Sequence, residues 1–413
     1  MVRRQMGGDS VENVVANTFR VGSRNDEQTL NVIRRQGPIS RIEIAKMTGL
    51  TPPTVTIITM KLLELGLIVE DRIGESSGGR RPLLLKINNL LATVIIIYIR
   101  SEKMIGYVID PQFKILWEDN RMTKGRKEEE VLEMMLEIIQ DCHRMATVPV
   151  LAVGVVVCGP VRIKDGIAVL LPKISWHNIP LKAIIEDKIG LPAFIENDVK
   201  ALSNGEYYYG SVKDACSMIL LKVSHDIGGS IILNGGIYRG VNDSAGEVGH
   251  TTIDIAGPMC SCGNYGCLEA LASEKALVDT VVKAIKEGQV SVVYDMVDGN
   301  LDNVIPENIY EAANAKDEVA VRILGQVARY LGIGIANLIN IFNPGIVIVS
   351  GGIVRGGQYI EDTIRQTIKE RSFESCSSVL DTCFLATTTE NTLKGAADLV
   401  FAEITKARWL GQR

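Results

Sequence analysis

Three cysteines and one histidine lie close together in the middle of this 413-residue chain. Cys260, Cys262 and Cys267 fall within eight residues, and His250 precedes them by ten positions. Three thiolates and one imidazole form a closed tetrahedral ligand set, as in structural zinc sites. Two glycines between the last two cysteines allow the backbone to curl tightly enough for the sulfurs to converge. The pattern predicts a structural Zn2+ rather than a chance group of free thiols, and it leaves no open position for a catalytic metal.

Carboxylates and an amide lie near this cluster or directly after an apolar run. Asn197 and Asp198 follow an apolar run, Glu247 lies just before His250, and Glu269 follows the last clustered cysteine. Such groups suit a polyhydroxyl ligand, because one carboxylate can accept hydrogen bonds from two vicinal hydroxyls. An Asn-Asp pair after a strand is also a common helix cap. Spacing alone leaves both interpretations open.

The first part of the chain predicts a small DNA-binding module over residues 25–88, preceded by a segment at 1–24. A short helix ends at Gly37-Pro38, and Ser40 with Glu43 forms a capping box for a second helix. Thr51 caps a third helix, and two strand-like runs at 67–72 and 83–87 flank a turn-rich segment. This order is typical of a winged helix-turn-helix, whose third helix enters the major groove.

The distribution of charge along the chain supports this interpretation of residues 25–88, which we call the head. Residues 1–86 carry a net charge of +4, whereas the rest of the chain carries −9. Short hydroxyl side chains near the third helix suit base edges, and paired arginines in a glycine-rich wing suit phosphates or a narrow minor groove. The predicted DNA-binding residues are Ser40, Arg41, Thr51, Thr54, Thr56, Arg80 and Arg81. The competing hypothesis is a protein-interaction domain with a solvated arginine pair.

The remaining residues, 89–413, predict an α/β body of two lobes with a cleft between them. Apolar strands alternate with amphipathic helices, starting with a β-meander and including a buried run at 151–157 of the kind found in parallel sheets. No run reaches the roughly 18–20 uninterrupted apolar residues of a membrane span. The first residues lack the apolar core of a secretory signal. We therefore expect a cytoplasmic protein without membrane contact.

Several motifs resemble those of the ROK family of repressors, open reading frames and sugar kinases. They are Ala-Gly-Glu-Val-Gly-His at 245–250, the cysteine motif at 260–269, Glu-Asn-Asp at 196–198 and Asn-Pro-Gly-Ile-Val-Ile-Val-Ser-Gly-Gly at 343–352. The resemblance extends from about residue 25 to about residue 402, and the whole chain is similar to the family's sugar-responsive repressors.

The resemblance implies an actin-like, sugar-kinase-type body that senses a sugar and a head that binds operator DNA. Family residues that hold sugar hydroxyls match Asn197, Asp198, Glu247, His250 and Glu269. The histidine would bind zinc through one ring nitrogen and sugar through the other, and the metal would shape the pocket. The resemblance also implies a homodimer or tetramer, and release of DNA by the sugar.

The same resemblance raises the alternative of a sugar kinase with an attached DNA-binding domain. The kinases carry Asp-x-Gly-Gly-Thr-Lys where this chain has residues 98–103, from Tyr98 to Lys103, with Arg100 and Glu102 in the loop. Their second phosphate loop, Gly-Thr-Gly-Ile-Gly, corresponds to Ser224 to Gly228, where Asp226 would repel phosphate. We therefore expect no enzyme activity, with Asp198 kept as a sugar contact.

The sequence does not name the sugar. A hexose, xylose, an amino sugar or a short oligosaccharide would use the same carboxylates. We expect discrimination to lie in pocket walls that include Trp176 and residues 157–159.

Overall fold

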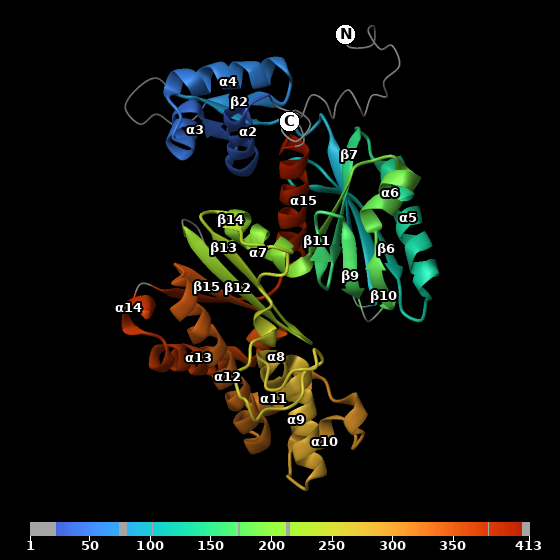
Figure 1. Ribbon diagram of the computed structural model, residues 1–413, viewed down its shortest axis with the longest axis vertical. Helices are drawn as coiled ribbons and strands as arrows, with labels where there is room; N and C mark the ends of the chain where they lie inside the picture. Colours follow the sequence, from blue (N-terminus) through green and yellow to red (C-terminus); the bar gives the residue numbers. More distant parts are fainter. Residues whose placement is uncertain are drawn as a thin grey trace. The chain divides into compact units, whose positions relative to one another are not determined.

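The computed structural model describes residues 22–73, 81–100, 102–171, 174–211, 215–378 and 380–406 (Figure 1). The chain forms two compact units, which we describe separately. Unit 1 comprises Met1–Gly210 and Glu390–Arg413, and unit 2 comprises Ser211–Thr389. The chain therefore leaves unit 1 once and returns to it at the C-terminal helix.

The head of unit 1 is a winged helix-turn-helix, as predicted. Its elements are α2 (Arg24–Gln36), β1 (Ile39–Ser40), α3 (Arg41–Thr48), α4 (Pro52–Glu64), β2 (Ile68–Ile73) and β3 (Leu83–Ile87). The capping box of Ser40 and Glu43 is present, and Thr51 caps α4. The sheet order is β1-β3-β2, so the wing hairpin gains a short third strand.

The lobe of unit 1 is built on a five-stranded sheet in the order β11-β7-β4-β5-β6. Its strands are β4 (Thr93–Ile99), β5 (Lys103–Ile109), β6 (Ile115–Met122), β7 (Val150–Val157) and β11 (Ala193–Asn197). The predicted meander is confirmed, because β4, β5 and β6 pair antiparallel in sequence order. Strand β7 is buried and parallel to β4, also as predicted.

Four helices belong to this lobe, namely α5 (Glu128–Met145), α6 (Leu181–Ile189), α7 (Asp198–Tyr209) and α15 (Thr389–Lys406). A separate antiparallel sheet, absent from our sequence predictions, comprises β8 (Val161–Arg162), β9 (Ile167–Leu171) and β10 (Trp176–Ile179). Head and lobe share one apolar core, which includes Leu30 and Ile33 of α2 together with Phe401 of α15. The head is therefore packed against the lobe within this unit.

Unit 2 has a second five-stranded sheet in the order β14-β13-β12-β15-β16. Its strands are β12 (Ser217–Val223), β13 (Ile227–Leu233), β14 (Gly236–Ile237), β15 (Ile346–Gly351) and β16 (Asp381–Leu385). Its helices are η2 (Val248–His250), α8 (Leu268–Ala272), α9 (Glu274–Lys286), α10 (Val292–Met296), η3 (Leu301–Asn303), α11 (Pro306–Asn314), α12 (Glu318–Phe342), η4 (Gly352–Gly356), α13 (Gly357–Arg371) and α14 (Glu374–Ser377).

Helix α12 is long and apolar enough to meet the length and composition criteria for a membrane span, and it alone does so among the described residues. Two-thirds of its apolar window is buried, and Leu331 and Ile335 belong to the core of unit 2. It is therefore a core helix by its packing. The mixed α/β fold class predicted from the sequence is confirmed.

Candidate functional site

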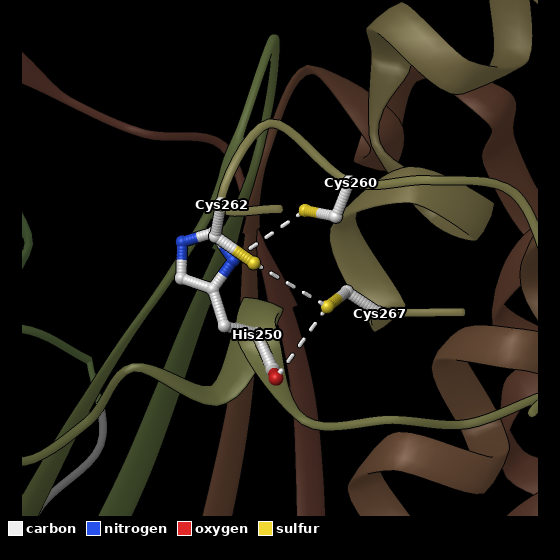
Figure 2. Close-up of side chains that lie close together, drawn as sticks. All are labelled: His250, Cys260, Cys262 and Cys267. Carbon is white, nitrogen blue, oxygen red and sulfur yellow. Dashed lines mark hydrogen bonds between the residues drawn. The ribbon is translucent and has the colours of Figure 1, made fainter. Parts of the chain in front are cut away.

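The predicted metal ligands converge at one point of unit 2 (Figure 2). The Sγ atoms of Cys262 and Cys267 are 3.8 Å apart, and Cys260 Sγ lies 3.6 Å from His250 Nδ1. Zinc bonds of about 2.3 Å to sulfur and 2.0–2.1 Å to nitrogen in a tetrahedron place two sulfurs about 3.8 Å apart and a sulfur and a nitrogen about 3.5 Å apart. The four side chains therefore form a group that can hold a metal ion.

The backbone around the cluster explains this convergence. Met259 and Tyr265 form an isolated antiparallel bridge, and a second bridge joins Thr252 to Cys267. Between these bridges the chain turns back through Gly266, whose φ is 66°. A Cβ there would lie 1.5 Å from the carbonyl oxygen of Asp254, so only glycine fits. The cluster is thus held by backbone pairing from both sides.

Two of the predicted sugar-binding carboxylates lie in the same unit. Glu269 Oε1 accepts a hydrogen bond from Ser261 at 3.1 Å and lies 3.8 Å from Cys260 Sγ, while its Oε2 accepts from the Ile227 amide at 3.3 Å. Glu269 therefore connects the cysteine loop to the start of β13. Glu247 is exposed and immediately precedes the 3-10 turn that carries His250.

The two other predicted sugar ligands lie in unit 1, at the junction of β11 and α7. Asn197 caps α7 by accepting from the amides of Val199 and Lys200, and its Nδ2 donates to the Gly159 carbonyl at 3.0 Å. Asp198 is 4% exposed, and its Oδ2 accepts from Cys158 Sγ at 3.3 Å. The helix-cap interpretation of the Asn-Asp pair is therefore correct for Asn197, and it leaves a sugar-binding role open.

Five of the predicted DNA-binding residues of the head, Ser40, Arg41, Thr51, Thr54 and Thr56, lie at or next to α3 and α4. Thr51 and Thr56 are exposed, and the hydroxyls of Thr51 and Thr54 are 2.8 Å apart. Arg41 Nε donates to the Thr59 hydroxyl at 2.8 Å, which holds this side chain against α4. Ser40 is 5% exposed and donates to Glu43, so its structural role is that of a buried cap.

Two further side chains on α4 were missed from the sequence. Ile57 and Met60 are 70% and 54% exposed, although both are apolar residues of the predicted recognition helix. The sequence signal was their spacing, because positions 57 and 60 fall outside the apolar series of Val55, Ile58 and Leu62. Arg81 is exposed at the start of the chain leading into β3, whereas Arg80 lies outside the described residues.

The sequence profile of the ROK family matches residues 95–403. The chain belongs to the ROK family. A profile described as a winged helix-turn-helix DNA-binding domain matches residues 23–69. Together these two matches cover the head and the body of the ROK protein described here.

Similar proteins match this chain over most of its length and over most of their own. The chain is 35% identical over 345 residues to a xylose repressor of Caldicellulosiruptor bescii, covering 81% of this chain and 84% of the relative. It is 30% identical over 364 residues to an N-acetylglucosamine repressor of Escherichia coli, covering 87% and 88%. A crystal structure of a ROK family transcriptional regulator, a homolog of the E. coli MLC protein, superposes with a TM-score of 0.78 at 28% identity, covering 96% and 98%.

Both segments that the sequence comparison aligned with phosphate loops contain a hydrogen-bonded turn among their described residues. The Arg100 amide donates to the Lys103 carbonyl at 2.9 Å, which closes the hairpin between β4 and β5. In unit 2, the Ser224 amide donates to the Asp226 carbonyl at 2.9 Å between β12 and β13. The Asp226 side chain is exposed in this turn.

One predicted pocket wall is wrong. Trp176 is fully buried in the apolar core of the lobe, and its indole nitrogen is 3.4 Å from the Glu128 carbonyl oxygen. It therefore has no surface to offer a ligand. In the other predicted wall, Val157 is buried and Cys158 is half-buried beside Asp198, so that wall stays a prediction.

Proposed function

We propose that this protein is a sugar-responsive transcriptional repressor that binds operator DNA through its head and a sugar through its body. The observation that carries the proposal is the winged helix-turn-helix match of this chain together with its similarity, over more than four-fifths of its length, to relatives named as repressors. The described head supports it, because α4 presents hydroxyl and apolar side chains to the outside. We propose that it acts in the cytoplasm as a homodimer, with a tetramer as the alternative.

The sugar ligands that we propose are Asn197 and Asp198 of unit 1 and Glu247, His250 and Glu269 of unit 2. The contacts within each unit support this assignment. Asp198 is a buried carboxylate at the first position of α7, and its oxygens can accept hydrogen bonds from sugar hydroxyls. His250 has Nδ1 on the side of the sulfurs, so Nε2 is the ring nitrogen available to a sugar hydroxyl.

The metal held by the histidine and the three cysteines is, in this proposal, structural Zn2+. Its ligands would be His250, Cys260, Cys262 and Cys267, and the distances among them fit zinc bond lengths. Bound zinc supplies a fixed centre for the loop. Through that loop it fixes the orientation of His250 and of Glu269, which lies against Cys260.

In the head we propose that Thr51, Thr54 and Thr56 contact base edges and that Arg41, Arg80 and Arg81 contact the DNA backbone. Ser40 is excluded because it is buried. Ile57 and Met60 extend the same helix surface with apolar groups, which suit contact with thymine methyl groups. The sugar's effect is release of DNA, achieved by favouring a conformation that binds the operator less well.

The alternative, a sugar kinase, is favoured by one feature, the buried Asp198 at the position of the family's catalytic base. We propose that it transfers no phosphate. The exposed Asp226 carboxylate and the turns at Arg100 and Ser224 support this, because they offer no glycine-rich amide cradle.

Two measurements on the full chain test the proposal. Operator DNA is first selected from a random duplex library, and its binding is followed by fluorescence anisotropy during titration with D-xylose, D-glucose and N-acetyl-D-glucosamine. We expect selective DNA binding that at least one of these sugars weakens. Phosphate transfer from ATP to the same sugars is measured in parallel. Turnover that disappears in Asp198→Asn would establish the kinase instead.

A further inference from the structure

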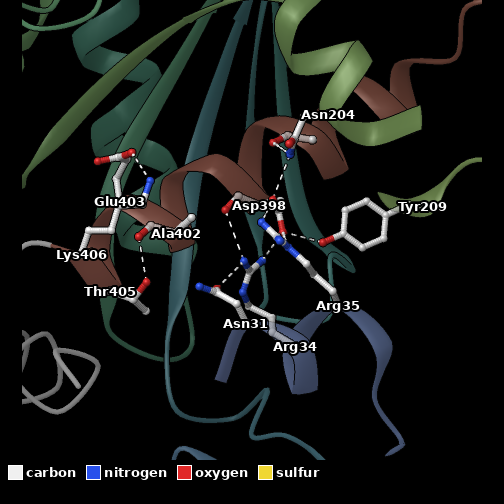
Figure 3. Close-up of polar contacts among 11 residues, drawn as sticks. Asn31, Arg34, Arg35, Asn204, Tyr209, Asp398, Ala402, Glu403, Thr405 and Lys406 are labelled. Carbon is white, nitrogen blue, oxygen red and sulfur yellow. Dashed lines mark hydrogen bonds and ion pairs between the residues drawn. The ribbon is translucent and has the colours of Figure 1, made fainter. Parts of the chain in front are cut away.

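A buried carboxylate connects the head of unit 1 to its lobe. Asp398 lies in α15, and its side chain is fully buried (Figure 3). Two consecutive arginines of α2, Arg34 and Arg35, point at it from the head. Residues 34 and 398 are 364 positions apart, so this contact joins the beginning of the described chain to its end.

Both arginines bind the carboxylate directly. Arg35 donates from Nε to Oδ1 and from Nη2 to Oδ2, each at 2.9 Å, and Arg34 Nη1 lies 2.8 Å from Oδ1. Burial by itself would raise the pKa of Asp398, but the two guanidinium groups and the hydrogen bonds lower it below its usual range. A two-pronged guanidinium contact of this kind is directional and fixes the orientation of its partner.

The other side of the carboxylate is held by α7. Asn204 Nδ2 donates to Asp398 Oδ2 at 2.9 Å and to the Gly395 carbonyl at 3.1 Å. The Tyr209 hydroxyl donates to Oδ1 at 2.6 Å. We call Arg34, Arg35, Asn204, Tyr209 and Asp398 the Asp398 hub. Asp398 is thus contacted by side chains of both α2 and α7.

Aromatic rings surround the two guanidinium groups. The Arg34 guanidinium carbon lies 5.6 Å from the ring centre of Phe113 and 5.5 Å from that of Phe401. The Arg35 guanidinium lies over the Tyr208 ring at 3.7 Å. These cation–π contacts add to the ion pairs, because water is excluded around them. The end of α2 is thus fixed to the lobe at several points.

Helices α7 and α15 are themselves in direct backbone contact. A Cβ on Gly205 would lie 1.8 Å from the Asn391 carbonyl oxygen, and one on Gly395 would lie 1.9 Å from the Ala201 carbonyl oxygen. Two glycines on facing helices therefore permit this approach. Asn391 also donates to Glu206 at 2.8 Å. Because the two helix backbones are closely packed at these glycines, a shift of α7 also moves α15.

The opposite end of α7 holds two of the proposed sugar ligands. Asn197 is the N-cap of α7 and Asp198 is its first residue, whereas Tyr209 is its last. Eleven residues at about 1.5 Å per residue separate the two ends by roughly 16 Å. One rigid helix therefore extends from the proposed sugar site to the hub.

We propose that α7 transmits sugar binding to the DNA-binding head through Asp398, which acts as a positioning residue for α2. The proposal rests on the proposed function, since it assigns the regulation of that same sugar site. A sugar that forms hydrogen bonds with Asp198 shifts α7 along its axis or rotates it about that axis. Asn204 and Tyr209 hold the carboxylate to α7, so Asp398 moves with that helix, and the two-pronged contact of Arg35 turns α2 and the head.

A purely structural hub would hold the head without responding to the sugar. The test therefore measures the response of the head and not its stability. Tyr209→Phe removes one hydrogen bond to Asp398 and keeps the ring that packs on Phe113, at a centroid distance of 4.7 Å. Arg35→Lys keeps the charge but loses the two-pronged contact. Tyr107→Phe on β5 is the matched control, since it is buried in the same unit outside the hub.

D-xylose, D-glucose and N-acetyl-D-glucosamine are added separately to each full-length protein. Binding is followed by the melting temperature, and the head by amide hydrogen exchange of α2 and α4. We expect the parent and Tyr107→Phe to show sugar-dependent exchange in α2. In Tyr209→Phe and Arg35→Lys the sugar should still raise the melting temperature, while the response of α2 falls about threefold or more. An undiminished α2 response in both variants would overturn the proposal.

A measurement without sugar distinguishes failure of this proposal from failure of the proposed function. If no sugar raises the parent's melting temperature, sugar sensing by this panel fails, and the coupling is then tested by Asp198→Asn alone. We expect this change at one end of α7 to alter exchange in α2, and to do so much less in the Tyr209→Phe background. Unaltered exchange in α2 would overturn the coupling whatever the sugar result.

Discussion

The metal cluster of unit 2 and the Asp398 hub of unit 1 both gather polar side chains around one centre, but they are built differently. The cluster takes all four ligands from residues 250–267, and Cys262 is exposed. The hub joins residues 364 positions apart, and its central carboxylate is fully buried and already surrounded by donors. The first centre would be completed by the proposed zinc ion, whereas the second depends on the completed fold of its unit.

Breaking the cluster should have the largest effect. We expect Cys262→Ser to abolish stoichiometric zinc binding and to lower the melting temperature substantially, because structural zinc contributes roughly 10–16 kcal/mol of apparent binding energy in small domains. His250 and Glu269 would lose their fixed positions together, and the response to sugar would disappear. Elemental analysis and calorimetry measure the two effects.

Cys216→Ser is the matched control, because Cys216 is an exposed thiol outside the cluster. It should keep both the metal and the melting temperature. Absence of zinc from parent protein purified without chelator would refute the assignment of the metal.

Disrupting the Asp398 hub should have the second-largest effect. Asp398→Asn leaves two buried guanidinium groups facing a neutral amide, and removing one partner of a buried ion pair costs roughly 3–5 kcal/mol. We expect the free energy of unfolding to fall by about that amount at pH 7. Chemical denaturation measures it, and Asp187→Asn, at an exposed carboxylate paired with Lys188, should change it little.

The pH dependence of this loss has a definite sign. The fold lowers the pKa of Asp398, so the ionised carboxylate stabilises the protein fully above its unfolded value of about 4. That contribution is lost as the pH falls through the folded pKa. The difference between parent and Asp398→Asn should therefore be constant from about pH 6 to 8 and should narrow below about pH 4. A difference that grows on acidification would contradict the ionised hub.

The contrast between the two centres also explains what the sequence could predict. His250 and the three cysteines were predictable because spacing and glycines within one loop define the site. The capping box at Ser40 and the helix start at Thr51 are local in the same way. Arg34, Tyr209 and Asp398 gave no such signal, because their meeting depends on α15 returning to the first lobe. Trp176 was misplaced for a related reason, since its burial is set by tertiary packing.

A change at the sugar end of α7 should have a smaller effect on stability but a clear one on ligand binding. Asp198→Asn replaces a carboxylate with an amide, and a charge-assisted hydrogen bond is worth roughly 1.5–3 kcal/mol. We expect sugar affinity to fall by about one to two decades and operator affinity without sugar to stay near the parent value.

Fluorescence anisotropy across a sugar titration measures both affinities of this variant. Asp165→Asn is the control, since this half-exposed carboxylate pairs with Arg162 away from α7. Release of DNA by Asp198→Asn at the parent's sugar concentration would place Asp198 outside the effector site.

The smallest effect should come from the wing. Arg81 is exposed beside β3, and a single phosphate contact contributes about one unit to the slope of log affinity against log salt. Arg81→Ala should therefore reduce that slope by roughly one unit, and the double change with Arg80→Ala by about one to two units. Preference among operator variants should change little, because phosphate contacts carry no sequence information directly.

Anisotropy titrations from low to moderate salt measure the slope, with Arg144→Ala as the control at an exposed arginine of the lobe. Since Arg81 belongs to neither centre, its variant should leave zinc content, unfolding at acidic pH and the α2 response unchanged. An unaltered salt slope in the double variant would mean that the wing arginines are solvated and that α3 and α4 supply the phosphate contacts.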